Sequence, residues 1–237
     1  MVKALGVSES IELEKESWIG SRKQKKNGRI PDKLESYLND HAQLNGKDLG
    51  PKIGAILMTL TVEKKKKARH HPEELASIHW GFEKRILMPC IKNDRYIMSE
   101  GKIDYILWYG ALTELETNFI VVKAKRLSSD HYWNLLQNMA KIHWARKYAM
   151  RKSTIYGLAT DGAQWRFVHI DEKGQQTGKL LRWDDDSIQV IARINTIIDQ
   201  AVSLAKHASR RRLHPRQGSV YKMTGCGIWD QVESEEK

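Results

Sequence analysis

The alternation of apolar patterns along the middle of the chain is the feature that most constrains its fold. Two runs rich in β-branched and aromatic residues, 104–109 and 118–124, predict strands, and the sequence GALTELET between them reads as a turn or hairpin connection. A helical pattern over residues 129–150 follows, and the runs 153–160 and 164–170 then predict two further strands. Strands interrupted by a long helix are typical of an α/β domain, so we expect a central mixed β-sheet flanked by helices.

Further elements are predicted on either side of this region. Residues 72–88 (PEELASIHWGFEKRILM) begin with proline and two glutamates and then place apolar residues at helical spacing, which predicts a helix ending before Pro89. Residues 188–205 form a clear amphipathic helical pattern. The apolar run 53–62 fits a strand or a helix, and KLLRW at 179–183 follows the turn-like DEKG. The expected core order is helix, strand, strand, long helix, strand, strand, helix.

The distribution of charge divides the chain into three parts. The 237 residues include 40 Lys or Arg and 29 Asp or Glu, a formal net charge of +11. Residues 1–71 contain 15 basic and 9 acidic side chains, residues 72–204 contain 18 and 16, and residues 205–237 contain 7 and 4. We therefore expect a basic, partly helical N-terminal extension over 1–71, a core over 72–205, and a basic linker and tail over 206–237.

Three basic clusters lie in these flanks. They are SRKQKKNGR at 21–29, KKKKARHH at 64–71 and SRRRLHPR at 209–216. Such runs contact phosphates or act as nuclear-import signals, although any one of them can also be a solvated face or a disordered arm. The three together favour nucleic acid as a partner, DNA before RNA, with contacts expected from Lys64, Lys65, Lys66 and Lys67.

The compartment and the oligomeric state are less constrained. No apolar run approaches the length of a membrane helix, and the N-terminal sequence lacks the apolar core of a signal peptide. The two cysteines, Cys90 and Cys226, have no metal-ligand spacing and fit a reducing compartment. We expect an intracellular protein, nuclear by its basic clusters, with no membrane partner; a homodimer is compatible with the sequence.

The stretch FIVVKAKR, residues 119–126, carries the strongest functional signal. Side chains alternate between the faces of a strand, so Lys123 and Lys125 share one face. With Asp104 on a neighbouring strand, they suggest a polar site at the edge of the sheet. Carboxylates on adjacent strands can hold Mg²⁺, and a nearby lysine can orient water against a phosphate.

Four segments together resemble the PD-(D/E)XK nuclease superfamily, and in particular a group of such domains in fungal proteins. They are SEGKIDYILWYG, NFIVVKAKR, IYGLATDGAQWRFVHID and LLRWDD, and the similarity extends over residues 72–204. The family pattern has a segment of the form R-P-D-Y-x-x-W-Y-G before a hydrophobic strand that ends in V-E-A-K-R. The resemblance implies a restriction-endonuclease-like core and a metal-dependent phosphodiester hydrolase that uses Mg²⁺ or Mn²⁺.

Matched position by position, the family motif is only partly present. The resemblance makes Asp104 the first metal-binding aspartate and Lys125 the motif lysine, while Ile103 replaces a usual proline. Lys123 stands where the second metal-binding acid is expected. An ammonium in place of a carboxylate changes the local charge by two units, each worth about 4 kcal/mol against a unit charge at ~4 Å and an effective dielectric of ~20. We therefore expect metal binding to be impaired and Lys123 to pair with Asp104.

Two further family features concern helices. Family nucleases often have a metal-binding glutamate on the helix before the aspartate, and Glu83 is the first candidate, with Glu74 the second; a surface residue on a charged helix is an equal alternative. Related nucleases also have a Q-x-x-x-Y pattern on the helix after the lysine. Here those positions are Asn134 and Asn138, so that pattern is absent.

Three functional hypotheses follow. In the first, the chain is a former nuclease that binds nucleic acid through Lys123, Lys125 and Arg126 and cuts poorly or not at all. In the second, it is an active endonuclease in which a displaced acid, such as Asp130 at the start of the next helix or a glutamate of the 110–117 turn, replaces the lost ligand. In the third, it is a non-enzymatic interaction scaffold or effector.

The tryptophans offer a second, weaker signal for nucleic acid. Exposed indoles can stack on bases, but tryptophans at strand and helix-face positions more often belong to the core. The residues concerned are Trp108, Trp133, Trp144, Trp165 and Trp183.

Overall fold

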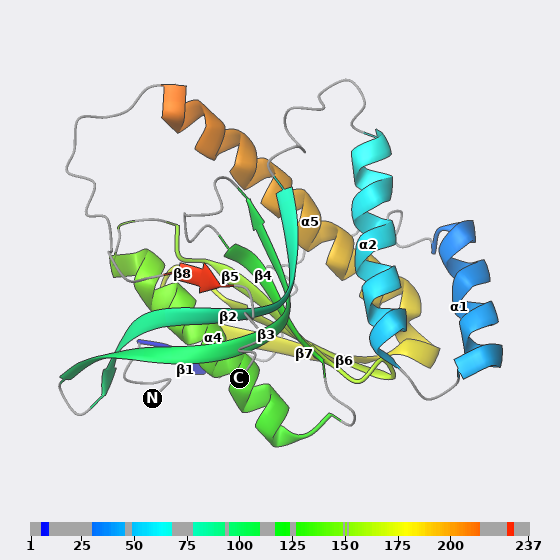
Figure 1. The fold of residues 1–237 in the computed structure, drawn as a ribbon, viewed down its shortest axis with the longest axis horizontal. Helices are drawn as coiled ribbons and strands as arrows, with labels where there is room; N and C mark the ends of the chain where they lie inside the picture. Colours follow the sequence, from blue (N-terminus) through cyan, green and yellow to red (C-terminus); the bar gives the residue numbers. More distant parts are fainter. Residues whose placement is uncertain are drawn as a thin grey trace, which may run out of the picture.

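One mixed sheet organises the molecule. The computed structural model describes residues 6–9, 30–45, 49–67, 78–92, 95–109, 117–123, 127–148, 150, 152–213 and 227–229. Its strands, in chain order, are β1 (Ser8–Glu9), β2 (Ile78–Lys92), β3 (Arg95–Tyr109), β4 (Thr117–Lys123), β5 (Ile155–Thr160), β6 (Gln164–Ile170), β7 (Gln175–Arg182) and β8 (Gly227–Trp229). They form one eight-stranded sheet in the order β1-β7-β6-β5-β4-β3-β2-β8 (Figure 1).

The centre of the sheet contains a change of strand direction. β2, β3 and β4 pair antiparallel, β4 pairs parallel with β5, and β5, β6 and β7 are again antiparallel. The parallel step requires a crossover, which is helix α4 (Ser129–Tyr148). The α/β class and the central mixed sheet predicted from the sequence are thus confirmed.

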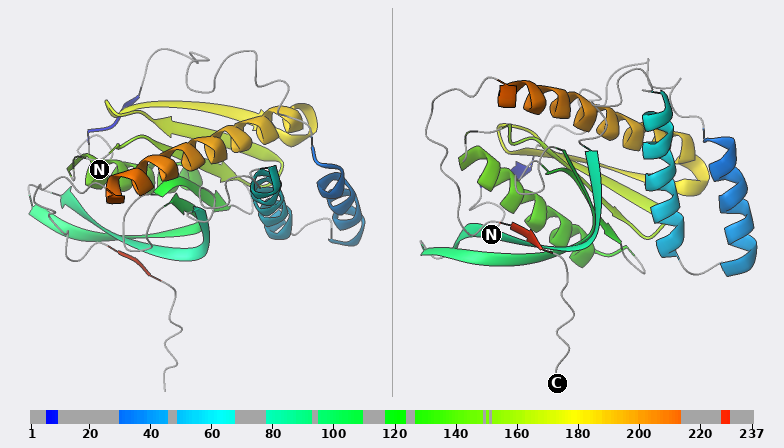
Figure 2. Two further views of the ribbon diagram at one scale, coloured as in Figure 1. Left: turned by 90° about the horizontal axis from the view of Figure 1, so that it is seen from above. Right: turned by 45° about the horizontal axis from the view of Figure 1, so that its top comes forward.

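Helices cover both faces of this sheet. On one face, α1 (Asp32–Asn45), α2 (Leu49–Lys67) and α5 (Trp183–Leu213) share a core with buried side chains of β3, β5 and β6, including Tyr105, Leu158 and Phe167. On the other face, α4 packs on a second core that contains Ile106 and Val168. Figure 2 shows α5 extended across the sheet, with α1 and α2 beside it. The two cores alternate along each strand, as the pleat requires.

The predicted helix over 72–88 is wrong from Ile78 onward. Residues 78–92 form β2, which pairs with β3 along almost its whole length. Ile78 and Phe82 fit the helical period, but Ile78, Trp80 and Phe82 together fit a period of two, and the long hairpin with β3 decides between the two patterns. Residues 72–77 lie outside the described part of the chain.

The flanks also differ from the expected boundaries. The apolar run 53–62 lies in helix α2, and the predicted helix 188–205 continues to Leu213, so the first part of the expected linker is helical. Residues 227–229, expected in a tail, pair with Arg85–Leu87 of β2 as strand β8. In the part of the chain that the structure describes, the helices lack the length and apolar character that a membrane span requires.

Candidate functional site

The strands that carry the aspartate and the lysines of the motif are neighbours. β3 and β4 pair antiparallel, with Tyr105 opposite Val121 and Ile106 opposite Ile120, which confirms the predicted strand pair. Asp104 precedes Tyr105, and Lys123 lies two residues beyond Val121, so both backbones reach the same end of this strand pair. The expected site therefore has a single location, where β4 ends.

Glu83 also lies at this location, although not on the expected helix. It lies on β2 rather than on a helix, between the register pairs Phe82–Tyr105 and Lys84–Ile103, which places it opposite Asp104. Its φ of 49° is left-handed, an unusual conformation for a residue with a side chain, and it costs about 1–2 kcal/mol. Glu83 is exposed and Asp104 is half-buried. The two predicted acids are thus brought to facing positions on adjacent strands.

The lysine end of the motif is described only through its backbone. Lys123 pairs with Thr160 of the parallel strand β5, so the chain direction and position at the end of β4 are defined. The side chain of Lys123, and all of Lys125 and Arg126, lie outside the described part of the structure. Pairing of Lys123 with Asp104, and phosphate contacts from Lys125 and Arg126, remain predictions.

Asp161, in the Asp-Gly sequence that joins β5 to β6, is a further carboxylate at this end of the sheet. It follows Thr160, and its Oδ1 accepts hydrogen bonds from the backbone N–H groups of Ala163 (3.1 Å) and Gln164 (2.7 Å). Its Oδ2 accepts a bond from the N–H of Leu127 at 3.0 Å. Leu127 is the residue after Arg126, so Asp161 fixes the chain immediately beyond the motif.

The signal that could have identified Asp161 is topological. If β4 and β5 are recognised as parallel neighbours, the residue after β5 must lie close to the chain that leaves β4. The buried carboxylate uses both oxygens on backbone donors. Its geometry is therefore that of a residue that positions the chain.

Asn134 and Asn138, which occupy the positions of the Q-x-x-x-Y pattern, help to hold α4 against β3. Asn138 is buried, and its Nδ2 donates to the Oδ1 of Asn134 at 3.1 Å and to the carbonyl of Lys102 at 3.3 Å. One turn further on, the buried Lys141 donates from Nζ to the carbonyl of Glu100 at 3.2 Å. These bonds fasten the helix to the segment of β3 that precedes Asp104.

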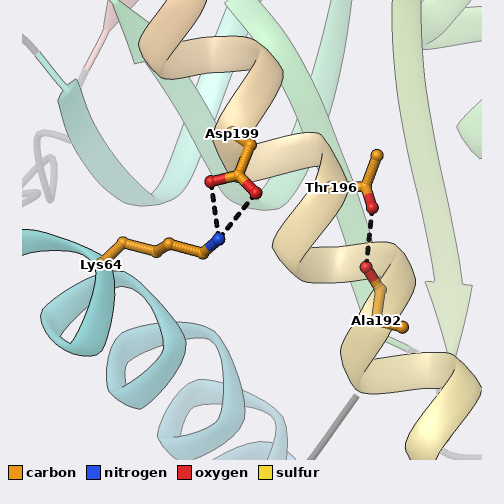
Figure 3. Close-up of polar contacts among 4 residues, drawn as sticks. All are labelled: Lys64, Ala192, Thr196 and Asp199. Carbon is orange, nitrogen blue, oxygen red and sulfur yellow. Dashed lines mark hydrogen bonds and ion pairs between the residues drawn. The ribbon is translucent and has the colours of Figure 1, made fainter. Parts of the chain in front are cut away.

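The predicted basic cluster of α2 is partly used within the protein. The Nζ of Lys64 lies 2.6 Å from both carboxylate oxygens of Asp199 on α5 (Figure 3). The Lys65 side chain is exposed, and Lys66 is exposed with its Nζ 3.8 Å from Glu63. The Lys67 side chain, residues 68–71 and the cluster at 21–29 lie outside the described residues, as do the side chains of 209–213 and all of 214–216. Within the 64–67 cluster, Lys65 and Lys66 are therefore the described lysines best placed for an outside partner.

A histidine beside this cluster adds little positive charge. Burial, and secondarily the charge of Lys65, lowers the pKa of His79 from its usual value of 6.5. The imidazole lies near the indole of Trp108, with ring centroids 6.5 Å apart. His79 is therefore mostly neutral at pH 7, and the local positive charge comes from the lysines.

The donor set at the end of β4 does not fit a complete magnesium site. Mg²⁺ prefers oxygen ligands, and Glu83 and Asp104 supply two carboxylates, while Lys123 occupies the position at which the second acid of the motif was expected. Within the described ranges, no three His, Cys, Asp or Glu side chains gather as a metal site. Asp130 is exposed in the first turn of α4, and Glu114 and Glu116 lie outside the described residues.

Comparison with known proteins does not identify a relative. No protein-family model matches the chain, and no curated protein matches it significantly.

Proposed function

We propose that the chain is a PD-(D/E)XK-like protein with a restriction-endonuclease-like core that binds nucleic acid and has weak or no phosphodiesterase activity. The observation that carries the proposal is the adjacency of β3 and β4, with Asp104 and the lysine-rich end of β4 at the same end of the strand pair. In this arrangement Lys123, Lys125 and Arg126 would contact phosphates, and the substitution of Lys123 for an acid would reduce metal binding. A nuclear location is part of this proposal, based on the basic clusters.

A second candidate is an active Mg²⁺- or Mn²⁺-dependent endonuclease. One observation favours it, namely the register that places Glu83 opposite Asp104 and so supplies a second carboxylate at the site. The exposed Glu83 could complete a two-acid site if a third oxygen ligand came from the substrate phosphate. The two candidates differ in whether the protein as it stands cuts.

A cleavage assay separates them. The wild type, Asp104→Ala, Lys123→Glu and Lys123→Gln are incubated with single- and double-stranded DNA and RNA in Mg²⁺ and in Mn²⁺. We expect no robust cleavage by the wild type and a metal-dependent increase in Lys123→Glu, because a carboxylate is restored. The Lys123→Gln control removes the positive charge without adding a carboxylate. Robust wild-type cleavage that Asp104→Ala abolishes would instead establish the active endonuclease.

A further inference from the structure

The face of the sheet that carries α4 has exposed positions over part of β6 and β7. Arg166 of β6 lies over the ring of Tyr132 of α4, 5.0 Å from its centroid, so it projects from the α4 face. Leu181 of β7 is buried in the core under α5, and alternation therefore turns its neighbours Leu180 and Arg182 to the α4 face. We call the positions on this face the β6–β7 strip. They are Gln164, Arg166, Gly178, Leu180 and Arg182.

The strip is accessible to solvent. Leu180 is 44% exposed, unusually high for a leucine in a sheet, and Gln164 and Gly178 are also exposed. α4 packs against β4, β5 and β6, but its helix does not cover these positions of β7. Gly178 leaves part of the surface without a side chain, so a flat ligand can approach the backbone there.

An aromatic row continues the strip onto α4. Trp133 is 50% exposed, and its ring centroid lies 5.8 Å from that of Tyr132, which in turn lies under Arg166. The Tyr132 hydroxyl accepts a hydrogen bond from Gln176 of β7, which fixes the ring. Arg166 pairs in register with Leu180. Trp133, Tyr132, Arg166 and Leu180 therefore form one connected surface.

The positive charge of the β6–β7 strip favours an anionic ligand. Its five positions include two arginines and no acid. Arg182 has Asp185 at 3.5 Å, but both side chains are about 70% exposed, and such a pair contributes little. Aromatic rings beside cations fit a single-stranded nucleic acid, whose bases can stack while its phosphates contact the arginines. A duplex hides the faces of its bases and cannot stack in this way.

The strip also leads to the candidate site. Arg166 pairs with Ala159 of β5, which pairs with Val122 of β4, the residue before Lys123. Ala159 is buried under α4, so a strand of nucleic acid lying on the β6–β7 strip would reach the end of β4 around the end of β5, where Gln164 adjoins the β5–β6 turn and Thr160 pairs with Lys123.

We propose that Trp133 and the β6–β7 strip bind single-stranded nucleic acid and deliver it to the end of β4. This inference rests on the proposed function and adds to it the class of ligand and a second contact surface. Bases stack on Trp133 beside the Tyr132–Arg166 pair, and Arg166 and Arg182 contact phosphates.

Binding of a fluorescent single-stranded oligonucleotide and of its duplex to the full chain tests the proposal. We expect Trp133→Ala to weaken single-strand binding about tenfold, Trp133→Phe to retain most of the affinity, and duplex binding to change little. Ile188→Ala removes an equally exposed apolar side chain on α5 and should have no effect. Thermal unfolding verifies that each variant is folded.

A second variant tests the charged part of the strip. Arg166→Gln should reduce the slope of log affinity against log salt by about one, because one phosphate contact is lost. If the wild type binds the oligonucleotide and neither Trp133→Ala nor Arg166→Gln alters that binding, the β6–β7 strip is not the binding surface. The proposed function is unaffected by that result. A wild type that binds no nucleic acid overturns both.

Discussion

At the scale of single residues, the candidate site combines two acids on facing strand positions with a carboxylate that fixes the chain beyond the motif. Glu83 holds a left-handed backbone conformation opposite Asp104, and Asp161 accepts the N–H of Leu127. Strained residues often occur at functional positions, where the surrounding structure maintains them. Here the β2–β3 hairpin maintains Glu83.

The strain at Glu83 gives a stability prediction. Glu83→Gly should raise the free energy of unfolding by about 0.5–1 kcal/mol, because glycine adopts a positive φ without steric cost and this gain exceeds its entropic penalty. Chemical denaturation of both proteins measures the difference. Lys84→Gly, at the adjacent position of β2 where φ is not positive, is the matched control and should lower stability. Equal losses in the two variants would show that Glu83 is not strained.

Asp161→Asn is expected to keep the hydrogen bonds of this side chain within the turn and to lose the one from the N–H of Leu127. The amide oxygen of asparagine can still accept the bonds from Ala163 and Gln164, and asparagine before glycine is favourable in a hairpin turn. Its NH₂ group would face the N–H of Leu127, so that bond is lost. We expect a loss of about 1–2 kcal/mol and weaker nucleic-acid binding.

Two measurements check this prediction. One is the rate of hydrogen exchange at the Leu127 amide, and the other is the affinity for an oligonucleotide. Asp171→Asn is the control, because Asp171 accepts similar turn bonds from Lys173 and Gln175 away from the end of β4. If the amide of Leu127 stays as protected in Asp161→Asn as in the wild type, the assigned role of Asp161 is wrong.

Part of this site could be predicted from the sequence. The apolar run after Asp104 and the sequence FIVVKAKR located the two strands, because strand side chains alternate and burial leaves a clear pattern. The positions of Glu83 and Asp161 depend instead on the register of β2 on β3 and on the parallel pairing of β4 with β5. Local patterns do not specify such pairings.

At the scale of elements, the segments with one clear period were predicted and the ambiguous ones were not. Helix α5 and strands β5 and β6 have patterns that fit only one type of structure. Residues 78–88 fit both periods, and pairing with β3 made them a strand. The end of α5 and strand β8 were missed because polar, basic sequence carries little periodicity.

The pairing of β5 with β6 makes stability depend on pH. His169 of β6 stacks on Tyr156 of β5, with ring centroids 4.7 Å apart, and burial lowers the pKa of His169 to about 4, while Asp171 raises it to a smaller extent. The unfolded chain, with a histidine pKa near 6.5, binds the proton more readily. The stability from neutral His169 is therefore present above pH 6.5 and is lost as the pH falls toward 4, by up to about 3 kcal/mol.

Denaturation at several pH values tests this dependence. His169→Phe should flatten the decline between pH 6.5 and 4, because phenylalanine keeps the aromatic stack and does not titrate. His131→Gln, which removes a histidine from the first turn of α4, is the control. An identical decline in His169→Phe would assign the pH dependence to other groups.

At the scale of the whole molecule, the N-terminal flank and the core are joined by packing and by charge. α1 and α2 contribute buried side chains to the core under α5, and Lys64 binds Asp199 across the α2–α5 interface. The net charge of +11 is carried by an α/β frame in which strand β5 alone separates the lysine-rich end of β4 from the β6–β7 strip. This arrangement is the basis of our proposal that the chain binds a polyanion.

The salt dependence of nucleic-acid affinity tests the central claim most directly. Binding of a single-stranded oligonucleotide to the full chain is measured between 50 and 200 mM salt. We predict a steep linear fall of log affinity with log salt, a shallower fall when Lys123, Lys125 and Arg126 are replaced by glutamine, and intact oligonucleotide at the end of each titration. Absent or salt-insensitive binding would contradict the account, as would an oligonucleotide cut during the titration.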